Sequence, residues 1–507
     1  IVVEGLLMPW RILAKDKDAI KSRIYLLAVL GLFVFGAFFS LYKLSESPSV
    51  WYDEGIYYQM SANLVNHGVI GLTVTPGTVE HFSKITVGYP LIYPIAASLA
   101  IFGNNILVAR ATMALFLLMV LLVAYFLVRK SIGKNEALLS LALLVSFAPL
   151  YGNGKSVLGE VPGILYLLLS LLLMHLARVN KEQGKSNYFL ALSGFFAGLC
   201  VTTKPIFILF IGALMFTFLF KRKDILCFGK KVFLFPIFFA ISFVLWIFTQ
   251  FQSGDSPAQI LAFYVNPQNV GSLSSTIMTN IGMFFGQIGS VYLLALLIIW
   301  SFSIIIRTKE QKPGFEEITS FIFSLLVTAA FFRTSGYLRY LFPAQVLSII
   351  YFPGSLYYCF GFIRAKMERY SLIHKIFSRK SAIILVVILF IFGTYQLMFN
   401  SWVADSYGSR KTAFWYNYFS TLPTDEKIFF YDTPEVAMFI KNGNYYQYLD
   451  LSPAGLFVGK DNNSLIDEGG VDQVILKTDT FQNNKDKWET HYRLEREAFK
   501  YTILVKK

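Results

Sequence analysis

Residues 51–58 read WYDEGIYY, and they follow an apolar run, residues 24–42, that is long enough to cross a bilayer. Two adjacent carboxylates, Asp53 and Glu54, therefore stand between aromatic residues where a membrane span ends. Charge is costly at the edge of hydrocarbon, and ionisable residues there normally face a cavity or each other. This acidic pair needs either a structural or a functional explanation, which the rest of the sequence has to supply.

The composition is that of a multi-pass membrane protein. The 507 residues are 55% hydrophobic and only 15% charged, and the mean hydropathy is +0.55. A soluble domain is about 45–50% apolar and about 25% charged. The net charge is +14, but most Lys and Arg residues lie in short runs between apolar segments and form no single basic patch. We therefore expect no nucleic-acid partner.

About eleven segments are apolar enough to cross a membrane, and their connections orient the chain. The N-terminus and alternate connections are basic, which places them in the cytoplasm under the positive-inside rule. This predicts a cell-membrane protein with a cytoplasmic N-terminus and an extracytoplasmic C-terminal domain; nothing in the sequence resembles a cleavable signal peptide. The expected spans are residues 24–42, 105–128, 136–152, 161–178, 188–203, 205–220, 232–251, 283–306, 317–332, 341–363 and 381–399.

The longest outward connection before the C-terminal domain, residues 43–104, is expected to contain two interfacial helices. Ile56, Met60 and Leu64 recur every four residues, which indicates an amphipathic helix along the membrane surface. Residues 89–103 are short for a span and contain two prolines, which favours a second, half-buried helix.

The composition changes after residue 400, which predicts two domains: a transmembrane domain, residues 1–400, and a small extracytoplasmic α/β domain, residues 401–507. The latter should contain strands at 426–432, 445–451, 471–477 and 500–506, and a short helix at 433–443 that stops at Gly443. Cys200, Cys227 and Cys359 show no spacing typical of a metal site or of a disulfide framework.

Further charged residues fall on the outward side of this topology, where they would converge with the acidic pair. An acidic pair surrounded by cations suits a site that binds an anion and also takes up a proton. Structural alternatives stay open for each: Asp53 as a helix N-cap, Glu54 in a first helical turn, Lys84 snorkelling to the interface, and Arg110 or Arg339 paired with Glu160. The outward charged residues are Lys84, Arg110, Lys155, Glu160, Lys204, Arg333 and Arg339.

An ordered set of short motifs resembles the GT-C glycosyltransferases, and most closely their protein O-mannosyltransferase-like and aminoarabinose transferase-like branch. The resemblance covers residues 24–400 and is carried by WYDEG (51–55), PLIYP (90–94), AR (109–110), GEVPG (159–163), TTKP (202–205) and RYLFPA (339–344). It implies transfer of a sugar from a polyprenyl-phosphate donor on the outer or lumenal face. The family's acid falls on Asp53, with Glu54 completing the acidic pair, and its loop cations fall on Lys84 and Lys204.

One stretch departs from the family pattern. Many relatives have an acid or amide before the basic residue and a Pro-Pro pair soon after it, whereas HFSKITVGYPL (81–91) has Ser83 before Lys84 and only Pro90 after it. We therefore do not carry over the metal reported for some relatives. Glu80 and His81 leave a divalent metal open, but they fall short of a full ligand set, and no cofactor is assigned.

The predicted reaction is an inverting transfer by a hexosyl or pentosyl transferase. Asp53 would remove the proton from an acceptor hydroxyl as it attacks C1 of the sugar, with no covalent glycosyl-enzyme. Lys84, Lys204 and Arg339 would stabilise the leaving lipid phosphate. Glu54, Arg110, Glu160 and Tyr337 complete the expected substrate site. The other nearby aromatic residues, Trp51, Tyr52, Tyr57, Tyr58 and Tyr340, fit an interfacial belt better than a sugar platform.

Two other functions remain open on the sequence. A transporter or flippase of lipid-linked sugars would also need cations and a groove, but it predicts half-chain repeats that are not evident here. A transferase that moves another phosphate-linked head group onto a lipid would look much the same. The acceptor, whether lipid, glycan or protein, and the sugar itself are not specified by the sequence.

Overall fold

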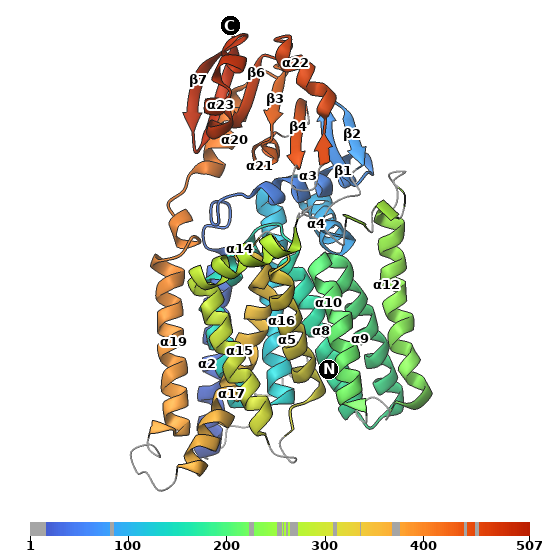
Figure 1. Ribbon diagram of the computed structural model, residues 1–507, viewed down its shortest axis with the longest axis vertical. Helices are drawn as coiled ribbons and strands as arrows, with labels where there is room; N and C mark the ends of the chain where they lie inside the picture. Colours follow the sequence, from blue (N-terminus) through green and yellow to red (C-terminus); the bar gives the residue numbers. More distant parts are fainter. Residues whose placement is uncertain are drawn as a thin grey trace.

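The computed structural model describes residues 17–81, 86–222, 228–250, 256, 258–259, 262–263, 272–307, 312–334, 336–367, 376–440, 444–451 and 456–507. Figure 1 shows upright helices in one layer and a C-terminal sheet above one end of it, which we call the sheet side. Helices α3 and α4 lie between the helix layer and the sheet, and a β-hairpin stands beside the sheet (Figure 1).

Seven helices in the described part of the chain belong to segments that are long and apolar enough to cross a membrane. All seven coincide with expected spans, because each carries an apolar run of nearly the length that a bilayer requires. They are α2 (Lys17–Leu41), α5 (Ile106–Ser131), α8 (Glu160–Val179), α12 (Leu234–Gln250), α15 (Ile288–Ile306), α17 (Phe342–Lys366) and α19 (Arg379–Phe399).

The remaining expected spans are helical but shorter, less apolar or broken. Residues 136–152 form two helices, α6 (Lys134–Val145) and α7 (Ala148–Lys155), that meet at an angle of 66°. Pro149 lies in the first turn of α7, where the missing N–H of proline costs nothing and a new helix can start. Of the seven spans above, the one expected at 283–306 is shorter than predicted, because the chain is divided at Gln287 between α14 and α15. The other helices of this layer are α9 (Gln183–Thr203), α10 (Leu209–Phe220), α14 (Leu273–Gly286) and α16 (Phe315–Phe331).

Helices α3 (Tyr52–His67) and α4 (Tyr89–Phe102) confirm the two helices expected in residues 43–104. Helix α3 ends at Gly68, whose φ of 70° is the left-handed conformation that favours glycine. Its burial differs from the one-sided pattern expected, because all residues from Glu54 to Asn63 are buried. Protein covers α3, and the elements packed against it include α4, the short helix α21 (Pro434–Ala437) and the hairpin strand β1 (Gly71–Thr75).

A hairpin of β1 (Gly71–Thr75) and β2 (Thr78–His81) follows α3 and was not predicted. The signal is present in LTVTPGTVEH, where β-branched residues alternate on both sides of Pro76-Gly77. Gly77 has a φ of 75°, which suits the turn.

The C-terminal sheet has six strands in the order β5-β4-β3-β6-β8-β7. Strand β3 is parallel to β4 and β6, and the other pairs are antiparallel. The four expected strands are confirmed as β3 (Ile428–Tyr431), β4 (Tyr445–Leu451), β6 (Gln473–Lys477) and β8 (Tyr501–Lys506); the two that were missed are β5 (Leu456–Val458) and β7 (Tyr492–Ala498).

The hydrophobic pattern fails at β7 because this edge strand is mostly exposed and reads YRLEREA, a charged composition that protects sheet edges. The expected helix at 433–443 is only α21 (Pro434–Ala437), and Gly443 lies outside the described residues. The domain boundary at residue 400 stays a prediction; α19 ends one residue before it, and α20 (Lys411–Thr421) follows before the sheet begins.

The sheet is seated directly on α3. Gln59 donates from Nε2 to the Pro434 carbonyl at 3.1 Å and to Oε1 of Gln447 at 3.2 Å. Tyr445 donates to Oε1 of Gln59 at 3.1 Å. A Cβ on Gly55 would lie 2.4 Å from backbone atoms of Pro434 and Glu435, so only glycine allows α21 to approach this closely.

We expect Gly55→Ala to lower the melting temperature of the purified protein in detergent. The added methyl group would meet backbone atoms that cannot rotate away, and overpacking costs about 1–3 kcal/mol. Gly361→Ala in α17 is the matched control, because a Cβ there meets nothing within 4 Å. Alanine for glycine in an open helical position stabilises by about 0.5–1 kcal/mol. Equal shifts in the two variants would contradict the close approach.

Candidate functional site

Four elements place charged residues together at the sheet side of the helix layer. Asp53 lies in the first turn of α3, Glu160 is the first residue of α8, Lys204 follows the last residue of α9, and Arg339 belongs to the 3₁₀ helix η5 (Leu338–Leu341). Helix ends leave backbone groups and side chains free to face a cavity. The fold therefore brings together residues that are far apart in the sequence.

Glu54 and Arg110 bind each other and have no exposed surface. Nε of Arg110 donates to Oε1 of Glu54 at 2.8 Å, and Nη2 donates to Oε2 at 2.7 Å; both side chains are 0% exposed. Nη1 of Arg110 donates to the carbonyls of Leu44 and Ser45, and the Val157 amide donates to Oε1 of Glu54 at 3.2 Å. This bidentate pair joins α3 to α5. Substrate contact for these two residues stays a prediction, and their geometry is that of a positioning pair.

Lys155 is also enclosed. Its ammonium group donates to the Tyr42 carbonyl at 2.7 Å and lies 5.8 Å from the centre of the Tyr407 ring. These contacts tie the end of α7 to the end of α2.

Asp53 and Arg339 form a second pair, and this pair keeps accessible surface. Nη1 of Arg339 lies 2.6 Å from Oδ2 of Asp53, and the side chains are 19% and 25% exposed. The helix N-cap is Trp51, so the alternative in which Asp53 caps α3 is wrong. The capping contact belongs to Glu54, whose Oε2 accepts from the Trp51 amide at 3.4 Å. Of the two acids in WYDEG, only Asp53 is open to a substrate.

Glu160 and Lys204 form the third pair. Nζ of Lys204 lies 2.5 Å from Oε1 of Glu160, and the side chains are 5% and 2% exposed. Oε2 of Glu160 is buried and has no hydrogen-bond partner among the residues that the structure describes. Glu160 also interacts electrostatically with Arg339, as Asp53 does. The sequence analysis named Arg110 or Arg339 as a structural partner of Glu160. The structure instead shows Lys204 in direct contact with Glu160.

Aromatic residues surround the accessible pair. The guanidinium group of Arg339 lies 5.5–6.0 Å from the ring centres of Trp51, Tyr337 and Tyr340, within the range of cation–π attraction. Tyr337 is 60% exposed. Burial raises the pKa of Tyr57, and the negative charge of Asp53 raises it further, so this phenol stays neutral. Its hydroxyl contacts Thr86 at 2.8 Å, a residue that no sequence pattern singled out.

Other expected residues lie away from these pairs or outside the described ranges. Tyr52 donates to Asp432 of the C-terminal sheet at 2.6 Å, and Tyr58 donates to Asn104 at 2.7 Å. Arg333 is exposed. Lys84 lies outside the described residues. Within the described residues, no group of three or more His, Cys, Asp or Glu could hold a metal ion, and Glu80 and His81 belong to the hairpin strand β2.

This arrangement can orient a carboxylate and stabilise negative charge. Asp53 offers an oxygen to a proton donor, while Arg339 and Lys204 hold positive charge within a partly enclosed region. Fixed charges act strongly where water is excluded.

Comparisons with known proteins bear on the fold and the class of this chain. Residues 90–248 match the dolichyl-phosphate-mannose-protein mannosyltransferase family. A comparison with curated protein sequences gives no match.

Among solved structures, ArnT from Cupriavidus metallidurans in the apo state has a TM-score of 0.65 at 12% identity, covering 96% of this chain and 98% of that one. The same protein bound to undecaprenyl phosphate has a TM-score of 0.64 at 11% identity, and the match covers 95% of this chain and 97% of that one. A third structure is the oligosaccharyltransferase AglB from Archaeoglobus fulgidus in complex with an inhibitory peptide and a dolichol-phosphate. Its TM-score is 0.55 at 12% identity, and the match covers 91% of this chain and 70% of that one.

The chain is thus a multi-pass membrane protein with the GT-C fold of membrane glycosyltransferases, and the resemblance expected from the sequence is confirmed. Within that class, it is similar over nearly its whole length to ArnT, and in residues 90–248 to the mannosyltransferase family.

The two acids of WYDEG should differ in their effect on stability. Glu54→Gln leaves the Arg110 charge buried without its carboxylate, which costs about 3–5 kcal/mol. Asp53→Asn removes a partly exposed pair, which costs about 1 kcal/mol or less. Thermal unfolding in detergent measures both. Adding Arg110→Met to Glu54→Gln should restore part of the loss, because the two residues share one interaction. Equal destabilisation by the two single variants would refute the assignment.

Proposed function

We propose that this protein is a membrane glycosyltransferase that moves a sugar from a polyprenyl-phosphate donor to an acceptor hydroxyl. The observation that carries the proposal is the Asp53–Arg339 pair, which remains accessible beside the enclosed Glu160–Lys204 pair at helix ends of a GT-C fold. The bound lipid phosphates of the two structural relatives support the donor class.

Asp53 is the proposed general base. Arg339 fixes the orientation of its carboxylate, so that one oxygen can accept the proton of the attacking hydroxyl. The hydroxyl oxygen forms the bond to C1 as the bond from C1 to the phosphate oxygen breaks. The lipid phosphate leaves with that electron pair, and C1 is inverted.

The charges of the site indicate how a phosphate would be held. Asp53 and Glu160 already balance Arg339 and Lys204. An anionic donor therefore needs a further cation or must displace a carboxylate from its partner. Lys84 stays our candidate for that cation, and its place close before Thr86 and α4 in the sequence suits the role. Lys204 and Arg339 would stabilise the charge that develops on the leaving phosphate.

The site is proposed to face away from the cytoplasm. Helix α8 begins at Glu160 within the site and ends at Val179, beside Arg178. Helix α5 begins near Tyr416 of the sheet side and ends with Arg129 and Lys130 in its last turn. The basic ends of both helices therefore lie opposite the site, as the positive-inside rule requires for an outward site.

Cysteine labelling of intact cells tests this orientation. A maleimide that does not cross membranes should label Lys485→Cys and leave Lys185→Cys unlabelled. These two side chains are matched in exposure, at 53% and 52%. Lysed cells give the control, in which both variants should react; labelling of Lys185→Cys in intact cells would reverse the topology.

One observation favours the transporter alternative: the 66° break between α6 and α7, since transporters use discontinuous helices. Turnover separates the two functions, because a transporter moves the lipid-linked sugar without forming a new glycosidic bond.

Asp53→Asn should lower transfer from a radiolabelled polyprenyl-phosphate sugar to cell-envelope acceptors by about 10²–10⁴-fold, the usual contribution of a general base. The amide keeps the shape of the carboxylate and removes its basicity. The melting temperature of the variant should stay close to that of the parent, which excludes misfolding as the cause. Near-parental turnover would remove Asp53 from the mechanism, and an inactive parent protein would favour the transporter.

A further inference from the structure

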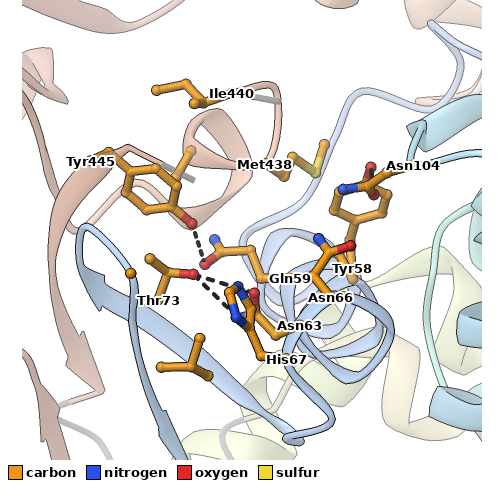
Figure 2. Close-up of a pocket in the computed structure, with 14 residues that line it drawn as sticks. Tyr58, Gln59, Asn63, Asn66, His67, Thr73, Asn104, Met438, Ile440 and Tyr445 are labelled. Carbon is orange, nitrogen blue, oxygen red and sulfur yellow. Dashed lines mark hydrogen bonds between the residues drawn. The ribbon is translucent and has the colours of Figure 1, made fainter. Parts of the chain in front are cut away.

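A cavity of about 380 Å³ lies beside α3, and the residues of the charged pairs do not line it. The C-terminal half of α3 forms one wall, the β1–β2 hairpin another, and the residues at and after α21 a third (Figure 2). Sites for small ligands occupy about 300–1,000 Å³, so the cavity is large enough to hold one. Asn66 and His67 are exposed, which shows that it opens to the surface.

The described lining of this cavity is polar but carries no Asp, Glu, Lys or Arg. Four side-chain amides face it, from Gln59, Asn63, Asn66 and Asn104. Each amide both donates and accepts hydrogen bonds, which is also what a sugar hydroxyl does. The chemistry contrasts with that at Asp53, where each acid contacts a cation.

Part of this lining is held rigidly by its own hydrogen bonds. Asn63 donates to the Gly71 carbonyl at 2.9 Å and also contacts the Thr73 hydroxyl. Gln59 is fixed by Tyr445 and Gln447. These bonds join α3, the hairpin and the sheet, so the walls keep their shape without a ligand.

Other polar groups in the cavity are unused. Oδ1 of Asn104 accepts from Tyr58 at 2.7 Å, which fixes the amide plane. Within the described residues, neither Nδ2 of Asn104 nor the amide of Asn66 makes a hydrogen bond. Figure 2 shows both amides on the same side of the cavity as Tyr58. They form a ready pair of contacts for a ligand hydroxyl.

We propose that this cavity binds a neutral oligosaccharide, which is the acceptor glycan if the proposed function is correct. A phosphate or a carboxylate binds best to a cation through charge-assisted hydrogen bonds, and among the described lining residues only His67 can carry a positive charge. Asn66 lies thirteen positions after Asp53 on α3, which is about 20 Å along a helix that rises 1.5 Å per residue. A ligand that occupies the cavity and reaches Asp53 must therefore be longer than a single sugar.

Direct binding to the full chain in lipid nanodiscs tests the proposal without any donor. The probes are maltotriose and tri-N-acetylchitotriose as neutral trisaccharides, an octyl glycoside of each, and trigalacturonate as the charged comparison. Saturation-transfer NMR should detect the neutral probes and not trigalacturonate. Equal binding of free and octylated forms indicates a free glycan, and tighter binding of the octylated form indicates a glycolipid; both support the proposal.

Variants locate the bound saccharide. Asn66→Leu should weaken binding about threefold to tenfold, the contribution of a hydrogen bond, and Asn66→Trp should abolish it by filling the cavity. Asn483→Leu, an exposed asparagine away from the cavity, is the control and should bind as the parent does. Asp53→Asn should also bind normally, so loss of transfer and loss of saccharide binding are separate outcomes.

Three results would overturn the proposal. The first is that neither neutral trisaccharide binds, in free or octylated form. The second is that trigalacturonate binds as well as they do. The third is that Asp53→Asn abolishes binding while the Asn66 variants retain it, which would place the saccharide at the charged pairs.

Discussion

The buried pair of Glu54 and Arg110 is the interaction on which the site depends. Placing two ions out of water is expensive, and the gain from their attraction repays that cost only when every remaining hydrogen-bonding group has a partner. Here the guanidinium group also contacts two carbonyls, and the carboxylate also accepts from two backbone amides. The pair therefore fixes where α3 begins relative to α5. The position of Asp53, one residue before Glu54, follows from that fixed start.

This arrangement divides the work between two neighbouring carboxylates. Glu54 is enclosed and holds the backbone, whereas Asp53 is partly exposed and contacts a cation that is itself surrounded by aromatic rings. In the proposed reaction a single acid could not do both, because this anchoring pair is completely buried whereas proton transfer requires access. The cost of charge beside hydrocarbon is met by pairing each acid with a cation from another element. In the proposed function, a donor phosphate at these pairs would need additional charge compensation, because each described acid there already contacts a cation.

The sequence predicted the helix layer and four strands, because these depend on local hydrophobic pattern. It did not predict which cation each acid would contact, since Glu54–Arg110 and Glu160–Lys204 join residues from separate elements whose approach only the fold determines. The sequence analysis named Glu160 as the alternative partner of both Arg110 and Arg339. In the structure Arg110 pairs with Glu54, and Arg339 pairs with Asp53. The amide-lined cavity escaped prediction for the same reason, because its walls come from α3, the hairpin and the C-terminal sheet. Strand β7 escaped because its exposed residues carry no hydrophobic alternation.

The burial of α3 has a consequence for how the chain is made. Gln59 contacts Pro434, which lies 375 residues later in the sequence. A ribosome that adds about 5–20 residues per second needs roughly 20–75 s to reach that point. During that interval the face of α3 that carries Gly55 and Gln59 is not covered by the C-terminal segment that later packs on it. The newly made chain must therefore pass through a stage in which its membrane helices are inserted while this helix remains open to unwanted partners. Closure of the sheet onto α3 must therefore wait until the segment that carries Pro434 has been made.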